Sequence, residues 1–165
     1  MLAPQPIPLA QRPRDRYLML CFVAFACTSF MVDRLAALDV DFCGEQSLGG
    51  SLCWYGRNLD PLFLANPQWL RVLSGISAWV FGPLYVLFAW AVWRGLDSVV
   101  PIARAWAVAM LYSMVVHLYM EYFGDYPPPR PWLLLGVYLP YAALPVLVLV
   151  RLRDDRPFSR MVELE

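Results

Sequence analysis

The sequence predicts an all-α membrane protein, a bundle of four transmembrane helices with kinked helices and an internal ligand pocket. Of its 165 residues, 60% are hydrophobic and 16% are charged, whereas soluble domains have about half apolar and about a quarter charged residues. A single domain of this length cannot bury so large an apolar excess in its own interior. Four apolar segments, each near the roughly 20 residues that cross a bilayer, therefore form the predicted spans.

The predicted spans follow one another along most of the chain. They run from about Tyr17 to Leu38, Trp69 to Trp93, Pro101 to Phe123, and Trp132 to Val150. Tryptophans lie at several span ends, where their amphipathic rings favour the headgroup region. We expect the first span to be retained, because Asp33 and Arg34 stand where a signal-peptide cleavage site would be.

The positions of the arginines predict the orientation of the bundle. All 13 basic residues are Arg. Nine lie on the side of the two termini, namely Arg12, Arg14, Arg16, Arg94, Arg104, Arg151, Arg153, Arg156 and Arg160, and four on the other side, namely Arg34, Arg57, Arg71 and Arg130. The positive-inside rule then places both termini in the cytoplasm. Arginine in place of lysine is typical of GC-rich genomes, so we expect a bacterial inner membrane rather than the endoplasmic reticulum.

The chain divides into three predicted parts: a cytoplasmic disordered arm (1–16), the transmembrane domain (17–150) and a cytoplasmic tail (151–165). The arm is rich in proline between Ala3 and Pro13. Zero net charge excludes the basic footprint of a nucleic-acid-binding protein. We also expect no bound metal and no cofactor.

Two cysteines lie in the predicted outer loop, which runs from about Asp39 to Gln68. Cys43 and Cys53 are separated by a flexible stretch from Gly44 to Leu52. In an oxidising compartment they could form a disulfide worth about 2–3 kcal/mol. Two unpaired thiols are the alternative.

Four ionisable side chains at or near membrane depth are candidates for function: Asp33, Asp60, His117 and Glu121. Inserting such a side chain into the membrane costs a few kcal/mol, so each one is a candidate for a functional role. Asp33 either faces the bundle or pairs with Arg34 at the interface. Asp60 precedes a proline in an aromatic segment, so it is either a helix cap or a partly buried carboxylate.

His117 and Glu121 are four residues apart in the third span and therefore share one helix face. They could form a proton-transfer pair. Alternatively, Glu121 lies at the outer interface and His117 hydrogen-bonds to a neighbouring helix.

Prolines inside the spans predict kinks that open space between the helices. Gly82-Pro83 stands in the second span, and Pro140 and Pro145 stand in the fourth. Tyr138 and Tyr141 are three apart, so both could line one cavity as hydrogen-bond donors or as faces for a cation. Three rings of the second span could join them or simply pack in the core: Trp79, Phe81 and Tyr85.

Three sequence runs together resemble the EXPERA domain, which the emopamil-binding sterol isomerase and the sigma-two receptor share. They are WYGRNLDPLFLANPQWL, FGPLY and VYLPYAALP. The resemblance covers about Cys27 to Arg151 and is closer to the sigma-two receptor. It implies a four-helix membrane pocket that opens laterally to the bilayer.

The resemblance also implies roles for individual residues. Asp33 would pair with a ligand cation, Asp60 would support it, and Tyr138 and Tyr141 would form an aromatic wall. The isomerases differ from this chain, because their catalytic His and Glu fall near Phe25 and Ser29, and their further Glu falls near Ser74 or Ser77. The acid and base of the sterol double-bond shift are thus missing from their usual places.

Two classes of function follow. In the first, the chain binds a hydrophobic, sterol-like, terpenoid or cationic amphiphilic molecule within the membrane, as a binder or as an isomerase or cyclase acting through a carbocation. Candidate catalytic residues are then Asp33, Asp60, His117 and Glu121. In the second, it is a non-catalytic membrane partner that stabilises or traffics another protein. A proton-coupled exporter ranks last, because the loops are unequal and no inverted repeat is visible. The sequence leaves open whether the chain forms a homodimer.

Overall fold

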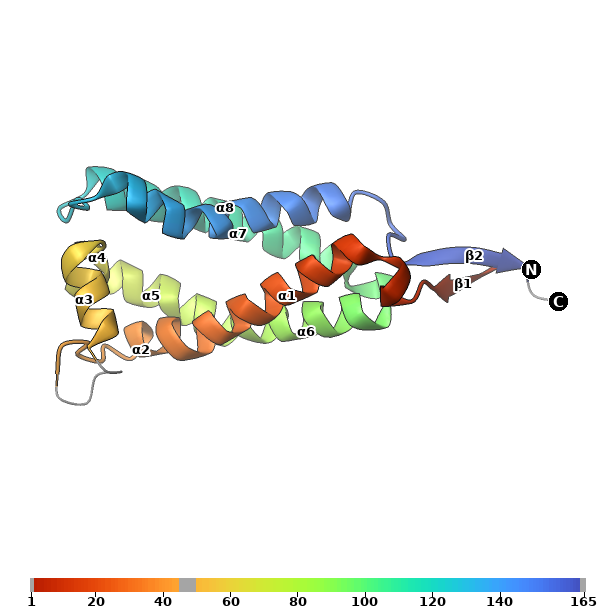
Figure 1. The fold of residues 1–165 in the computed structure, drawn as a ribbon, viewed down its shortest axis with the longest axis horizontal. Helices are drawn as coiled ribbons and strands as arrows, with labels where there is room; N and C mark the ends of the chain where they lie inside the picture. Colours follow the sequence, from red (N-terminus) through yellow and green to blue (C-terminus); the bar gives the residue numbers. More distant parts are fainter. Residues whose placement is uncertain (1, 45–49, 164–165) are drawn as a thin grey trace.

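The computed structural model describes residues 2–44 and 50–163, which form a mostly helical, elongated bundle (Figure 1). Four helical segments in this part of the chain are long and apolar enough to cross a membrane, as predicted. They are Pro13–Ala37, Gln68–Arg94, Asp97–Phe123 and Pro131–Arg151. This is an integral multi-pass membrane protein.

The first two spans each contain a π-helical stretch. The first consists of α1 (Pro13–Thr28), η2 (Ser29–Asp33) and α2 (Arg34–Ala37), and the second of α5 (Gln68–Ile76), η3 (Ser77–Phe81) and α6 (Gly82–Arg94). Pro83 is the second residue after η3, inside the continuous second span. A proline ring clashes with the backbone of the preceding helical turn, and the wider π turn of η3 gives the ring room there.

The other two spans are more regular. The 3-10 turn η4 (Asp97–Val99) leads into α7 (Val100–Phe123). The last span, α8 (Pro131–Arg151), continues through Pro140 and Pro145 as a single helix.

The helices pack as two pairs, α1 with α6 and α7 with α8 (Figure 1). Trp106 of α7 joins the pairs, because its ring lies 5.8 Å from that of Phe22, 5.4 Å from that of Tyr85 and 5.6 Å from that of Phe88. Such aromatic contacts add about 0.5–1.5 kcal/mol each beyond their buried area. This aromatic core holds the pairs together on the side of the chain termini.

At the opposite end, two short helices cap the bundle (Figure 1). They are α3 (Ser51–Asn58) and α4 (Pro61–Ala65). A Cβ on Gly56 would lie 2.2 Å from Cγ of Leu64, so the close packing of the two helices requires glycine there. Cys43 and Cys53 form a disulfide in the structure. The flexible stretch expected between them includes residues 45–49, which lie outside the described residues.

The termini form a two-stranded antiparallel ribbon where a disordered arm was expected. Strand β1 (Leu2–Pro6) pairs with β2 (Ser159–Glu163), with Pro6 opposite Ser159. The turn η1 (Leu9–Gln11) then leads into α1. Prolines suit a strand of this kind, because a two-stranded ribbon leaves alternate N–H groups unpaired. The ribbon extends beyond the bundle, so both termini lie at the same end (Figure 1).

A buried ion cluster fastens this ribbon to the helices. Asp15 accepts hydrogen bonds from Nη1 of Arg12 at 2.7 Å and from Nε of Arg151 at 2.7 Å. The ring of Phe158, which is fully buried, lies 5.1 Å and 5.4 Å from the two guanidinium carbons. Asp97 accepts hydrogen bonds from the backbone N–H of Phe158 and from the hydroxyl of Ser159.

Candidate functional site

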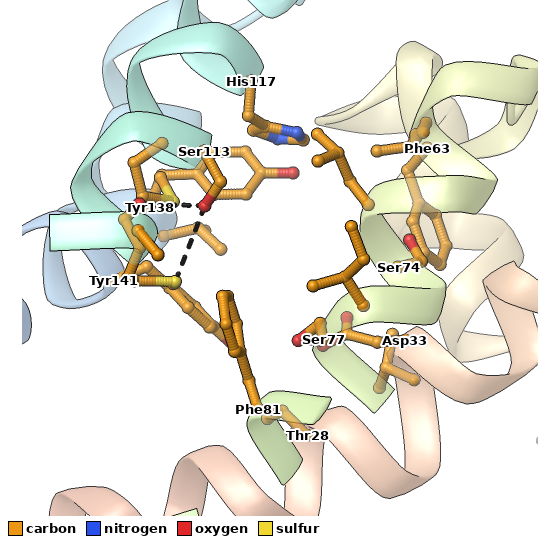
Figure 2. A pocket seen from close by; sticks show the side chains of 18 of the residues that line it. Thr28, Asp33, Phe63, Ser74, Ser77, Phe81, Ser113, His117, Tyr138 and Tyr141 are labelled. Atoms are coloured by element: carbon orange, nitrogen blue, oxygen red, sulfur yellow. Dashed lines mark hydrogen bonds between the residues drawn. The ribbon is translucent and has the colours of Figure 1, made fainter. Parts of the chain in front are cut away.

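A cavity of about 510 Å³ lies between the helix pairs, next to the cap. Its volume is within the range of pockets that hold drug-sized ligands, about 300–1,000 Å³. All four spans and both cap helices contribute to its wall, part of which Figure 2 shows. The lining residues are Thr28, Val32, Asp33, Leu52, Tyr55, Phe63, Leu70, Leu73, Ser74, Ile76, Ser77, Phe81, Ala109, Met110, Tyr112, Ser113, Met114, His117, Val137, Tyr138 and Tyr141.

Asp33 lies on one side of the cavity, where the two π-helical stretches meet (Figure 2). Its carboxylate accepts a hydrogen bond from Oγ of Ser77 at 2.6 Å, and Ser77 contacts Oγ of Ser29 at 3.1 Å. Arg34 does not pair with it, because its guanidinium lies over the ring of Trp79 at 5.6 Å. Within the described residues no arginine forms an ion pair with Asp33. The cavity wall thus carries a carboxyl group without a cationic partner.

Asp60 is fully buried and contacts two tyrosines of the cavity wall from behind. Its Oδ1 accepts the backbone N–H of Phe63 at 2.8 Å, so Asp60 caps α4. Its Oδ2 accepts the hydroxyls of Tyr55 at 3.0 Å and Tyr138 at 2.5 Å. Both interpretations of Asp60, helix cap and buried carboxylate, are therefore realised together. Its contacts support the tyrosines of the wall rather than the carboxylate of Asp33.

Tyr55 can act only as a hydrogen-bond donor to this carboxylate. Burial, followed by the neighbouring charge of Asp60, raises the pKa of the Tyr55 hydroxyl well above its ordinary value. The hydroxyl therefore keeps its proton at any physiological pH. This bond fastens α3 to the start of α4 inside the cap.

His117 lies on the opposite side of the cavity from Asp33, on α7, and Glu121 follows it one turn later in the same helix (Figure 2). The ring of His117 lines the cavity and lies 4.6 Å from that of Tyr138 (Figure 2). Glu121 is fully buried behind it, with Oε2 3.9 Å from Nε2 of His117, and interacts electrostatically with Asp60. Among the described residues, Nε2 of His117 and both carboxyl oxygens of Glu121 have no hydrogen-bond partner. Glu121 lies in the last turn of α7, at the capped end of the bundle, and its side chain is buried there.

Of the aromatic residues predicted to line the cavity, some do so, and the others lie in the aromatic core or on the outer surface. Tyr138, Tyr141 and Phe81 line the cavity, and Tyr141 stacks on Phe25 at 4.4 Å. Trp79 lies on the outer surface with 56% of its area exposed, and its ring contacts the guanidinium of Arg34 rather than the cavity. Tyr85 is buried in the aromatic core, with its hydroxyl 3.9 Å from the sulfur of Met110.

Two residues that donate hydrogen bonds to the candidate carboxylates were not among the sequence-based candidates. Ser77 is the hydrogen-bond donor to Asp33, and Tyr55 is a donor to Asp60. Ser74 and Ser77, three apart in an otherwise apolar span, provided a signal, since they share a helix face that lines the cavity. For Tyr55, the only signal was its place five residues before Asp60 in an aromatic segment.

A family model for EXPERA, the expanded EBP superfamily, matches residues 48–152. The chain belongs to the EXPERA family. The EXPERA match contains Asp60, His117, Glu121 and the tyrosines of α8, but it begins after the first span and so does not contain Asp33. The resemblance expected from Cys27 onwards is thus shown for a shorter stretch. No curated protein and no solved structure matches this EXPERA chain.

Proposed function

We propose that this EXPERA protein binds a hydrophobic molecule with a cationic group, such as a sterol-like or terpenoid amine, inside its intramembrane cavity. The observation that carries the proposal is the carboxyl group of Asp33 on the wall of a largely apolar cavity, without an arginine partner among the described residues. A charge at membrane depth is costly when it is unpaired. A cation on the ligand would supply the missing partner, as the resemblance to the sigma-two receptor also implies.

The rest of the wall suits the same class of ligand. Tyr138, Tyr141 and Phe81 present aromatic rings, whose faces attract cations. Met110 and Met114 offer flexible, polarisable surface that adapts to different apolar shapes. We therefore expect binding that tolerates variation in the apolar body of the ligand and depends strictly on its cation.

Asp33→Asn is expected to weaken the binding of a hydrophobic tertiary amine about 10- to 100-fold, because the variant keeps a hydrogen bond to Ser77 but loses the charge. The dissociation constant is measured with purified protein in lipid nanodiscs. Asp125→Asn is the matched control, since Asp125 is exposed in the loop between α7 and α8. A neutral analogue with carbon in place of nitrogen should bind weakly to both proteins. Unchanged amine affinity in folded Asp33→Asn contradicts the proposal.

Alkene isomerisation is a second candidate, favoured by an acid and a base on opposite sides of the cavity (Figure 2). A protonated Asp33 would donate its proton to one alkene carbon, whose π electrons form the new C–H bond and leave a carbocation near the aromatic rings. His117 would then remove a proton from a neighbouring carbon, and that C–H electron pair would form the shifted double bond. The substrate gains and loses one proton and is neither oxidised nor reduced.

Incubation with unsaturated sterols or terpenoids in D₂O tests this second candidate. We expect a shifted double bond and one deuterium per product molecule, measured by mass spectrometry, and loss of both in Asp33→Asn. Substrates that bind but return without deuterium and without a shift exclude the isomerase and leave the binding function intact.

The proposal includes an orientation, with both termini in the cytoplasm and the cap in the periplasm. The end with the termini carries nine of the 13 arginines. The disulfide between Cys43 and Cys53 lies at the other end and suits an oxidising compartment. These two observations are independent of each other and support the same orientation.

A further inference from the structure

We propose that a lipid-facing surface around Arg34 binds a helix of another membrane protein, one that carries a carboxylate within the bilayer. We call the set of Arg34, Phe30 and Trp79 the Arg34 surface. None of the three lines the cavity, so the inference goes beyond ligand binding and does not depend on it. The observation that carries it is the exposed guanidinium of Arg34, which lies within the first span and has no carboxylate partner among the described residues.

The Arg34 surface lies deeper in the bilayer than the outer end of the first two spans. At that end Asp39 and Arg71 form an exposed ion pair at 2.6 Å, as expected near the headgroups. In the second span, Trp79 follows Arg71 at a distance of about 12 Å along the helix, further from that end. The guanidinium of Arg34 lies over the ring of Trp79, with its carbon 5.6 Å from the ring centroid. The hydrocarbon core is about 30 Å thick in all, so this charge is well inside it.

The side chain of Arg34 is directed towards the middle of the bilayer. Side chains of a helix lean towards its N-terminus, and the first span starts at Pro13, at the end with the chain termini (Figure 1). Arginines near a span end commonly extend the other way, into the headgroup region. Here the contact with Trp79 holds the guanidinium in place instead. Arginine stays charged at every accessible pH, so its charge calls for an anion at that depth.

Neither a second copy of this chain nor a phospholipid offers that anion. In the described residues of the four spans, the carboxyl groups of Asp15 and Glu121 are fully buried. Asp33 accepts a hydrogen bond from Ser77 beside the cavity, and Asp97 is occupied by the terminal ribbon. Phospholipid phosphates lie at the level of the headgroups, above the guanidinium. A carboxylate on the helix of another membrane protein is the source that matches both the charge and the depth.

The two rings beside the guanidinium suit contact with a helix. Trp79 is 56% exposed and Phe30 is 39% exposed. Phe30 stands one helical turn before Arg34 and so lies on the same side of the first span. Its ring reaches the second span, where the absence of a side chain at Gly82 makes room for it, since a Cβ there would lie 2.9 Å from Cε1 of Phe30. Arginine and aromatic side chains are enriched at protein–protein interfaces, and a carboxylate here would complete an ion pair away from water.

The test measures energy transfer between the labelled protein and synthetic transmembrane peptides in liposomes. The peptides are leucine-rich helices with one glutamate, or one glutamine, placed about 10 Å below the outer headgroups. We expect the wild type to bind the glutamate peptide about tenfold more tightly than the glutamine peptide. In Arg34→Gln this ratio should fall to about one. Arg130→Gln is the matched control and should keep the ratio, since Arg130 is exposed between α7 and α8, outside the spans.

The charge and its position are tested directly by Arg34→Glu and Trp79→Leu. Arg34→Glu should reverse the preference, so that a peptide with arginine at the same depth binds more tightly than the glutamine peptide. Trp79→Leu releases the guanidinium towards the headgroups, so the preferred peptide should become one with its glutamate nearer the outer surface. The affinity of Arg34→Gln for a hydrophobic amine is measured in parallel and should match that of the wild type. This last result shows that the variant is folded and that the Arg34 surface is separate from the cavity.

The contrary results are distinguishable from one another. Equal affinities of the wild type for the glutamate and glutamine peptides overturn the inference, as does a tenfold ratio that survives in Arg34→Gln. The peptides may be bound alike while Arg34→Gln lowers energy transfer between two copies of the protein, or the enrichment of labelled phosphatidylglycerol around it. The occupant is then a second copy or a phospholipid phosphate, and the inference is overturned as well. Failure of the wild type to bind amines overturns the proposed function alone, because the peptide measurements do not involve the cavity.

Discussion

Asp15→Ala is expected to lower the free energy of unfolding by about 3–5 kcal/mol, the cost of removing one partner from a buried ion cluster. Asp15 is 1% exposed and lies between the guanidinium groups of Arg12 and Arg151. Without it, two positive charges lie close together, one on Arg12, whose side chain is 5% exposed, and one on Arg151, whose side chain is 32% exposed. Arg12 is held there by two further hydrogen bonds, to the backbone oxygens of Val92 in α6 at 2.8 Å and of Ile7 at 2.9 Å, so it cannot easily leave.

The loss can be measured as reversible unfolding in mixed detergent micelles. Because Phe158 lies against both guanidinium groups, we expect the ribbon to detach as well and to become sensitive to protease. Asp154→Ala is the control, since the Asp154 side chain is 73% exposed and lies 3.8 Å from Arg153. An exposed pair of this kind contributes about 0–1 kcal/mol. Equal losses in the two variants would show that the cluster does not fasten the ribbon.

The same cluster explains what the sequence could and could not predict about the fold. The four spans follow from apolar length, and the structure confirms them. The first span was predicted to begin at Tyr17, yet α1 begins at Pro13. Arg14, Asp15 and Arg16 make that turn look like a solvated segment, but Asp15 also binds Arg151, which lies at the other end of the chain. The residues near Asp15 in the sequence do not reveal this long-range pairing.

The terminal ribbon was missed for a related reason. The proline-rich start of the chain has the composition of a disordered arm, and nothing nearby can pair with it. Its partner strand begins at Ser159, at the other end of the sequence. Antiparallel pairing over that separation depends on the bundle bringing both termini to one end.

In the candidate site, it was easier to predict which polar residues would take part than to predict which aromatic side chains would face the cavity. Asp33, His117 and Tyr138 stood out because polar groups are rare in apolar spans, and the structure brings all three to the cavity. Trp79 could not be excluded in advance, because rings that face lipid and rings that face a ligand are equally apolar. In a soluble protein the hydrophobic pattern separates inside from outside, but in a bilayer both faces of a helix are apolar.

Asp60→Ala is expected to destabilise the protein by at least about 3 kcal/mol and to weaken ligand binding as well. The substitution removes the cap of α4, worth about 1 kcal/mol. It also leaves the hydroxyls of Tyr55 and Tyr138 buried without their acceptor, at about 1–3 kcal/mol for each unsatisfied group. Tyr138 belongs to α8, so its bond to Asp60 joins the cap to the α7–α8 pair across the cavity. Unfolding in detergent and amine binding in nanodiscs measure the two effects.

Two further variants assign the loss to its cause. Tyr138→Phe removes only the bond between α8 and the cap, so it should reproduce the weaker binding with a smaller loss of stability. Asn58→Ala removes an exposed bond to the backbone oxygen of Trp54 within the same cap, and it should change neither measurement appreciably. If Asp60→Ala destabilised the protein but bound amines normally, Asp60 would serve the cap alone, and the position of Tyr138 in the cavity would not depend on it.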